Sequence, residues 1–158
     1  MTTEPETQSL DGARRIGDVT AAASPQRPGR GSAVIRDVSA DDHGVVVVSI
    51  GGEIDMVAVP ILSTALHIQL GRPECRALIA DLTGITFFTA RGIAVLEQVN
   101  QRARSMGIAF CLAGCPRAVL WPLEAMGMSG AFSLHQSVAA AITDVKAIST
   151  RGAETGPD

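Results

Sequence analysis

The chain has 158 residues, a length typical of one domain, and its 46% hydrophobic but only 3% aromatic residues predict an aliphatic core. A formal net charge of −3, without any clustered run of Lys and Arg, argues against a nucleic-acid-binding protein. No apolar run reaches the roughly 18 to 20 residues that span a bilayer, and no secretory leader is recognisable, so we expect a cytoplasmic protein without membrane contact.

The two ends of the chain differ in composition from its middle. Residues 1–31 are rich in Thr, Ser, Gly, Pro and Arg and have no sustained apolar period, and residues 146–158 have a similar character. Such segments bury too little apolar surface to offset the entropy lost on ordering, so we expect two disordered tails. The predicted domain covers residues 32–145.

Strands and helices alternate within this domain. Two β-branched runs separated by a polar, Gly-containing turn predict an antiparallel hairpin over 33–38 and 45–50, and we interpret Gly51-Gly52 as a turn after it. Apolar spacings and runs then predict, in chain order, helix 57–70, strand 77–82, helix 90–106, strand 108–113, helix 116–126, strand 132–134 and helix 137–145.

This alternation predicts an α/β fold. Strands that alternate with helices form βαβ crossovers, which place the strands in parallel. We therefore expect a mixed, mostly parallel sheet with an N-terminal β-hairpin and with helices packed on it. On the first helix, the spacing places Val57, Ile61, Leu62, Ala65 and Leu66 near one helical face.

The residues offer little support for an enzyme. His43, His67 and His135 are too far apart in sequence for a metal pair, no phosphate-binding glycine loop follows a strand, and no Gly-x-Ser-x-Gly elbow is present. Asp55 and Asp81 lie at strand ends, where α/β sheets meet ligands, but no nucleophile accompanies them. We expect a non-enzymatic binding protein without metal or cofactor. Of the functions considered, a hydrolase or transferase that uses these acids has the least support.

The cysteines leave two interpretations open. Cys75 precedes one predicted central strand, and Cys111 lies in the next. If the two strands are parallel neighbours, the sulfurs could approach each other and form a disulfide. The alternative is that both cysteines are small apolar residues of the core.

Two motifs resemble those of STAS domains. Gly52-Glu53-Ile54-Asp55, after the hairpin, is similar to the Gly-x-hydrophobic-Asp signature of that family. Residues 78–96, LIADLTGITFFTARGIAVL, are similar to its second signature, in which a strand ending in Asp-Leu-Ser/Thr is followed by a loop and by Gly-Leu on a helix. The later elements follow the same order, so the resemblance covers about residues 33–145.

The resemblance implies a regulator of the anti-sigma factor antagonist branch. Members of that branch bind an anti-sigma factor of the serine-kinase type and thereby free a sigma factor. The implied partner-binding surface consists of Asp55, Thr83, Gly84, Thr89, Ala90, Arg91 and Gly92. The alternative function is a STAS module that senses a small molecule or nucleotide at the same surface.

The switch loop departs from the family pattern. Family members carry Asp-Ser-Ser-Gly and are inactivated by phosphorylation of a serine, whereas this chain reads Thr89-Ala90-Arg91-Gly92, which places Ala90 at the acceptor position. Because alanine has no hydroxyl, we expect a regulator insensitive to phosphorylation there, controlled instead by redox chemistry or abundance. Thr89 is an alternative acceptor one position early. Arg91 could pair with Asp55 or with an acid on the partner.

Overall fold

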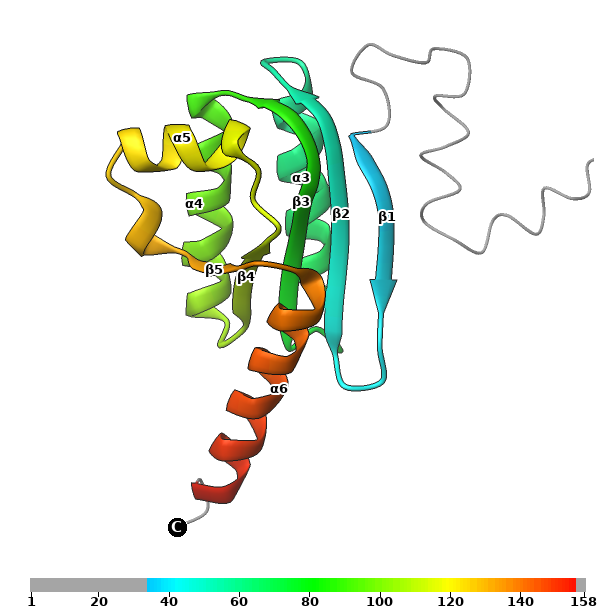
Figure 1. Ribbon diagram of the computed structural model, residues 1–158. Helices are drawn as coiled ribbons and strands as arrows, with labels where there is room; N and C mark the ends of the chain where they lie inside the picture. The colour runs from blue at the N-terminus through cyan, green and yellow to red at the C-terminus, as the bar shows by residue number, and fades with distance from the viewer. Residues whose placement is uncertain (1–33, 156–158) are drawn as a thin grey trace, which may run out of the picture.

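The computed structural model describes residues 34–155, with side chains described for residues 34–148, so the predicted N-terminal tail, residues 1–31, lies outside the described residues. The elements follow one another as β1 Ile35–Ala40, β2 Val45–Ile54, α3 Ala58–Leu70, β3 Ala77–Phe88, α4 Ala90–Ser105, β4 Ala109–Ala113, α5 Arg117–Ala125, the 3-10 turn η1 Ser129–Ala131, β5 Ser133–His135 and α6 Val138–Thr155 (Figure 1). This order confirms the predicted alternation of strands and helices.

The five strands form one sheet in the order β1-β2-β3-β4-β5. β1 and β2 pair antiparallel, and every other neighbouring pair is parallel, which confirms the predicted mixed α/β sheet. β2, β3 and β4 each pass at their carboxyl ends into a helix that leads to the next strand. The ends of β2 and β3 and the starts of α3 and α4 therefore gather at one end of the molecule, the upper end in Figure 1.

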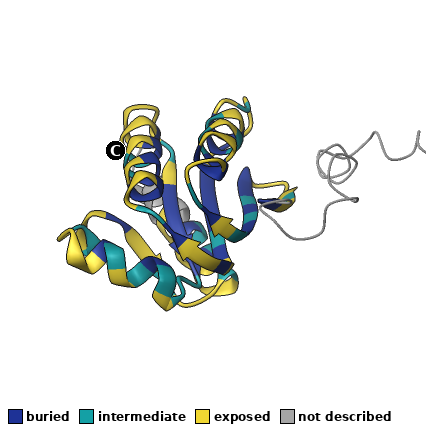
Figure 2. Cartoon of the chain, turned by 90° about the horizontal axis from the view of Figure 1, so that it is seen from above, coloured by how far each residue is buried: buried dark blue, intermediate teal, exposed yellow. Residues whose placement is uncertain are grey.

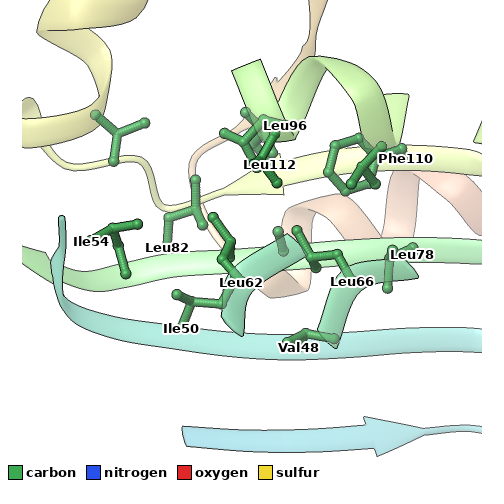
Figure 3. Packing of buried hydrophobic residues seen from close by; sticks show 14 of the residues in the cluster. Val48, Ile50, Ile54, Leu62, Leu66, Leu78, Leu82, Leu96, Phe110 and Leu112 are labelled. Atoms are coloured by element: carbon green, nitrogen blue, oxygen red, sulfur yellow. The ribbon is translucent and has the colours of Figure 1, made fainter. Parts of the chain in front are cut away.

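Side chains alternate between the two faces of the sheet and form two apolar clusters. On one face, strand residues such as Val48, Leu78 and Leu112 pack against Leu62 of α3 and Leu96 of α4 (Figure 3). The smaller cluster, on the other face, consists of Val45, Ala77, Ile79, Cys111, Ala113, Ala141 and Val145. Buried residues concentrate in the strands and on the inward sides of the helices (Figure 2).

Our interpretation of Gly51-Gly52 as a turn is wrong. Both residues lie inside β2, which continues to pair with β3 until Ile54 meets Phe88. The parallel register shifts on either side of the glycine pair, and Gly52 has a φ of +86°, a conformation that costs glycine no steric energy. The pair thus forms an irregular, bulged part of the strand rather than its end.

Two elements were also predicted to be shorter than they are. β3 ends at Phe88 instead of residue 82, because Ile85 and Phe88 still turn into the core between exposed neighbours. The last helix was predicted to end at Val145, but α6 continues to Thr155 and extends past the lower end of the sheet (Figure 1). Residues 146–155 of the predicted C-terminal tail are therefore helical.

The structure places Cys75 and Cys111 apart. Both are buried free thiols, but Cys75 belongs to the cluster beneath α3 and α4, whereas Cys111 belongs to the cluster beneath α6. Cys111 pairs with Ile79 in the parallel register, and the neighbouring strand residues alternate between these two faces. The possible disulfide is thus absent from this structure, and both cysteines are small apolar core residues.

Candidate functional site

The carboxyl ends of β2 and β3 lie side by side where each strand passes into a helix. Ile54 pairs with Phe88, and the Thr89 N–H donates a hydrogen bond of 3.3 Å to the Ile54 carbonyl oxygen. Asp55 and Thr89, the next residues of their strands, therefore begin two adjacent turns. We call residues 55–57 and 87–91, which surround this point, the rim.

Asp55 holds the start of α3. Its Oδ1 atom accepts hydrogen bonds from the backbone N–H groups of Val57, at 3.1 Å, and of Ala58, at 3.0 Å. These are N–H groups that have no partner within the helix itself. Among the described residues no ion pair joins Asp55 to Arg91, so the possible pairing of these two side chains is not formed. Asp55 instead fixes the start of α3 by accepting hydrogen bonds from backbone N–H groups.

Thr89 is the N-cap of α4. Its Oγ1 atom accepts a hydrogen bond from the Gly92 N–H at 3.3 Å, and its carbonyl oxygen accepts from the N–H groups of Gly92 and Ile93 at 2.9 and 3.2 Å. The residue is half-buried. The hydroxyl oxygen of Thr89, the alternative phosphate acceptor, therefore has a structural role as the cap of α4.

The next three residues divide between surface and core. Ala90 and Arg91 are exposed on the first turn of α4, whereas Gly92 is fully buried. A Cβ atom on Gly92 would lie 2.9 to 3.1 Å from ring atoms of Phe88, which is itself buried. Gly92 thus lets α4 approach the end of β3, and it lies beneath the predicted binding surface rather than on it.

Thr83 and Gly84 lie further down β3, in a separate polar cluster. The Thr83 hydroxyl donates to Asp81 Oδ1 at 2.6 Å, the Thr83 N–H donates to the same atom at 3.1 Å, and Ser49 Oγ donates to Asp81 Oδ2 at 3.3 Å. Gly84 pairs with Gly51. The predicted site therefore separates into the rim and this Asp81 cluster, in which the carboxylate is already hydrogen-bonded.

The rim has an apolar character that the sequence motifs do not indicate. Met56, Val57 and Phe87 are 61%, 77% and 50% exposed, and Ile61 on the first turn of α3 is 46% exposed. Val57 and Ile61 do not share the face of Leu62 and Leu66 as predicted, because the buried stripe of the helix continues through Leu62, Leu66 and Leu70. The regular spacing of these three leucines was the available signal. Large apolar side chains exposed together at one end are typical of an interaction surface.

Comparison with known proteins identifies the family. The family model described as STAS domain matches residues 38–141, more than half of the chain. The chain belongs to the STAS domain family. The order of its strands and helices and the match to the family model agree, so the fold expected from the two sequence motifs is confirmed.

Several similar STAS proteins are anti-sigma factor antagonists. The chain is 29% identical over 107 residues to the anti-sigma-F factor antagonist RsfB of Mycobacterium tuberculosis, covering 68% of this chain and 86% of that protein. A crystal structure of an anti-sigma factor antagonist from Mycobacterium paratuberculosis matches with a TM-score of 0.62 and 29% identity, covering 70% of this chain and 93% of the other. The antagonist SpoIIAA in its unphosphorylated form, at 15% identity, shares the fold with a TM-score of 0.61 over 70% of this chain and 96% of its own.

These matches confirm the class expected from the sequence. The chain is a STAS protein that is similar to anti-sigma factor antagonists, which are non-enzymatic regulators. In the residues that the structure describes, no helix is long and apolar enough to cross a bilayer, and no three His, Cys, Asp or Glu side chains gather as a metal site. The histidines lie on three different elements: His43 in the β1–β2 turn, His67 in α3 and His135 in β5.

Two grooves of the STAS domain lie away from the rim. One, of about 860 Å³, lies at the lower end of the sheet between the β1–β2 turn, the start of β3 and α6. The Lys146 Nζ atom, 3.2 Å from Asp41 Oδ2, joins α6 to the β1–β2 turn beside it. The other, of about 460 Å³, lies along α6 next to His135. Neither groove is lined by a rim residue.

Loss of the Thr89 cap is expected to destabilise the STAS domain modestly. A Thr89→Ala variant lacks the oxygen that accepts from the Gly92 N–H, which typically costs about 1 kcal/mol of unfolding free energy. A Thr89→Ser variant retains that oxygen and is the control. Urea denaturation of the three proteins measures the difference, and an alanine variant as stable as the parent would contradict the capping role.

The three thiols are expected to react slowly in the folded protein. Burial raises the pKa of Cys75 and Cys111 above the ordinary thiol value, and it raises the pKa of half-buried Cys115 to about 11. Because the thiolate is the reactive form, labelling with a disulfide reagent should be slow at neutral pH and faster as pH rises toward 11 or when the chain unfolds. Rapid labelling of any cysteine at pH 7 would contradict this. The raised pKa values argue against redox control through these thiols.

Proposed function

We propose that this STAS protein binds a kinase-like anti-sigma factor through its rim and thereby frees a sigma factor in the cytoplasm. Membership of the STAS family and the likeness to anti-sigma factor antagonists support this class of partner. The rim supports the location, because it combines exposed apolar side chains with a cation, Arg91, at the start of α4. Apolar side chains and arginine are enriched at the centres of protein interfaces.

The missing hydroxyl at position 90 carries the regulatory part of the proposal. The motif resemblance implies that Ala90 takes the place of the serine that family members present for phosphorylation, and Ala90 is exposed on the first turn of α4. The neighbouring hydroxyl, that of Thr89, is half-buried and accepts the Gly92 N–H. A kinase-like partner therefore meets no hydroxyl at position 90, and the neighbouring Thr89 oxygen is engaged as the cap of α4, so we infer that the complex persists when ATP is present.

Arg91 supports a partner with an acidic contact. A cation at a helix N-terminus is unfavourable to the free helix, because the backbone N–H groups there carry partial positive charge. Asp55 does not form an ion pair with Arg91, and within residues 34–148 no other acid does so either. An acid on the anti-sigma factor that meets Arg91 would offset this cost in the complex and would favour that partner over others.

The small-molecule alternative has less support at the rim. The two grooves described above contain no rim residue, and the Asp81 cluster already satisfies its carboxylate with protein donors. A nucleotide that bound the rim would raise the thermal stability of the free chain, by about 2.7 kcal/mol at 100 times its dissociation constant. A thermal-shift screen with nucleotides therefore separates this alternative from binding to a protein.

Isothermal titration against purified anti-sigma factors tests the proposal. Each factor of the serine-kinase type encoded by the organism of origin is titrated with the full chain, in the presence and absence of ATP. We expect saturable binding to one of these factors in both conditions. The proposal would be wrong if none of the factors bound, or if the rim variant Arg91→Glu bound as well as the parent chain.

A further inference from the structure

Helix α5 exposes the chain's single tryptophan. Trp121 is 69% exposed, whereas Val119 and Leu123 on the opposite side of the helix are fully buried. Arg117, one turn before Trp121, and Glu124, one turn after it, are also exposed. The indole therefore lies on the outer, charged face of α5 and takes no part in the core of the domain.

This outer face lies at the same end of the molecule as the rim. In Figure 1, α5 lies beside the upper end of α4, where the rim is found, and α5 is in contact with both α4 and β3. Val119 and Leu123 belong to the same apolar cluster as Ile93 in the first turns of α4. A partner protein that covers the start of α4 can therefore reach α5 without crossing the sheet.

We propose that Trp121 is a second contact for the anti-sigma factor that binds the rim, with its indole inserted into an apolar pocket of that partner next to an acidic group. This inference rests on the proposed function. Arg117 and Arg91 are the cations nearest in sequence to the two contacts, and among the described residues neither forms an ion pair. They match a partner surface with the same acidic character at both contacts.

The chemistry of the side chain favours a protein as occupant. An indole offers a large apolar surface with one N–H donor, and tryptophan is enriched among the few residues that dominate binding energy at protein interfaces. Removing such a residue typically weakens binding by about 30-fold or more. Because Trp121 is exposed in the free chain, its removal should leave the stability of that chain nearly unchanged.

The single tryptophan makes a direct measurement possible. The chain is labelled with 5-fluorotryptophan, which gives one fluorine signal, and each purified serine-kinase-type anti-sigma factor is added unlabelled. We expect the binding factor to shift the fluorine signal of Trp121 and to protect the indole from a soluble quencher. Binding that leaves both the signal and the quenching unchanged would overturn the Trp121 contact while the proposed function stands.

Two variants separate this contact from a general loss of structure. Trp121→Ala is expected to weaken binding by about 30-fold, with unfolding unchanged. Ile68→Ala is the matched control, because Ile68 is 58% exposed but lies near the far end of α3, and it should bind like the parent chain. Equal affinity of the Trp121 variant would overturn the inference. The inference would also be overturned if Trp121→Ala changed the self-association of the chain but not its affinity for the factor. In that case the indole would contact a second copy of the chain. If no factor binds, the inference fails together with the proposed function.

Discussion

An Arg91→Glu variant is expected to lose at least 30-fold in affinity for its anti-sigma factor while its free form becomes slightly more stable. The loss follows because an acid would replace the cation that faces the partner's acidic group, and like charges in an interface cost several kcal/mol. The gain follows because an acid at the start of α4 is favourable to the helix by about 0.3–1 kcal/mol. Titration calorimetry and urea denaturation measure the two effects separately.

These opposite signs distinguish a contact residue from a structural one. A variant that bound weakly because it was damaged would also unfold more easily. Arg104→Glu is the matched control, since Arg104 is an exposed arginine in the last turn of the same helix. There an acid should destabilise the helix slightly and leave affinity unchanged. If Arg91→Glu and Arg104→Glu lowered affinity equally, the loss would come from the changed net charge of the chain and not from a contact made by Arg91 in the rim.

A Gly92→Val variant is expected to lose about 1–3 kcal/mol of unfolding free energy and to bind its partner weakly. The new side chain would overlap the Phe88 ring, which is buried and has little room to move, so the start of α4 would shift away from the end of β3. Because Ala90 and Arg91 lie on that turn, the shift would also displace the rim. Thermal or urea unfolding and titration of the same samples measure both effects.

The control for this variant is Ala94→Val, which places the same side chain on an exposed position of α4. It carries the β-branched helix penalty without the overlap and should lose only a few tenths of a kcal/mol. Gly92→Ala should be intermediate, because the better helix propensity of alanine offsets part of the overlap. A valine variant as stable as the Ala94→Val control would show that the approach of α4 to Phe88 is not tight.

The fold was largely predictable because its local patterns agree with its topology. The β-branched runs of β1 and β2 and the apolar run that begins β3 contain enough alternation or length to be recognised alone. The end of β3 could not be recognised from the sequence. The register shift near Gly84 breaks the alternation that would mark Ile85 and Phe88 as strand residues. The length of α6 was missed because Gly152 and several Ser and Thr residues disfavour a helix locally.

The candidate site was only partly predictable, because local sequence patterns place residues along the chain but do not determine their exposure. The motif positions of Asp55, Thr89 and Arg91 placed them correctly at helix starts, because sequence neighbours of a strand end stay at that end. Exposure depends on tertiary packing, so the buried position of Gly92 and the exposed Val57 could not be read from the motif. Trp121 was missed because an apolar residue on a short helix is usually part of the core, and only the structure shows that Val119 and Leu123 have that role.

The most direct test is incubation of the full chain with ATP and its serine-kinase-type anti-sigma factor, followed by mass spectrometry and titration of the recovered chain. We expect no added phosphate and an unchanged dissociation constant. An Ala90→Ser/Arg91→Ser variant, which restores the usual Ser-Ser-Gly order, should gain a phosphate and dissociate. A phosphate on Thr89 of the parent chain that abolishes association would contradict the central proposal.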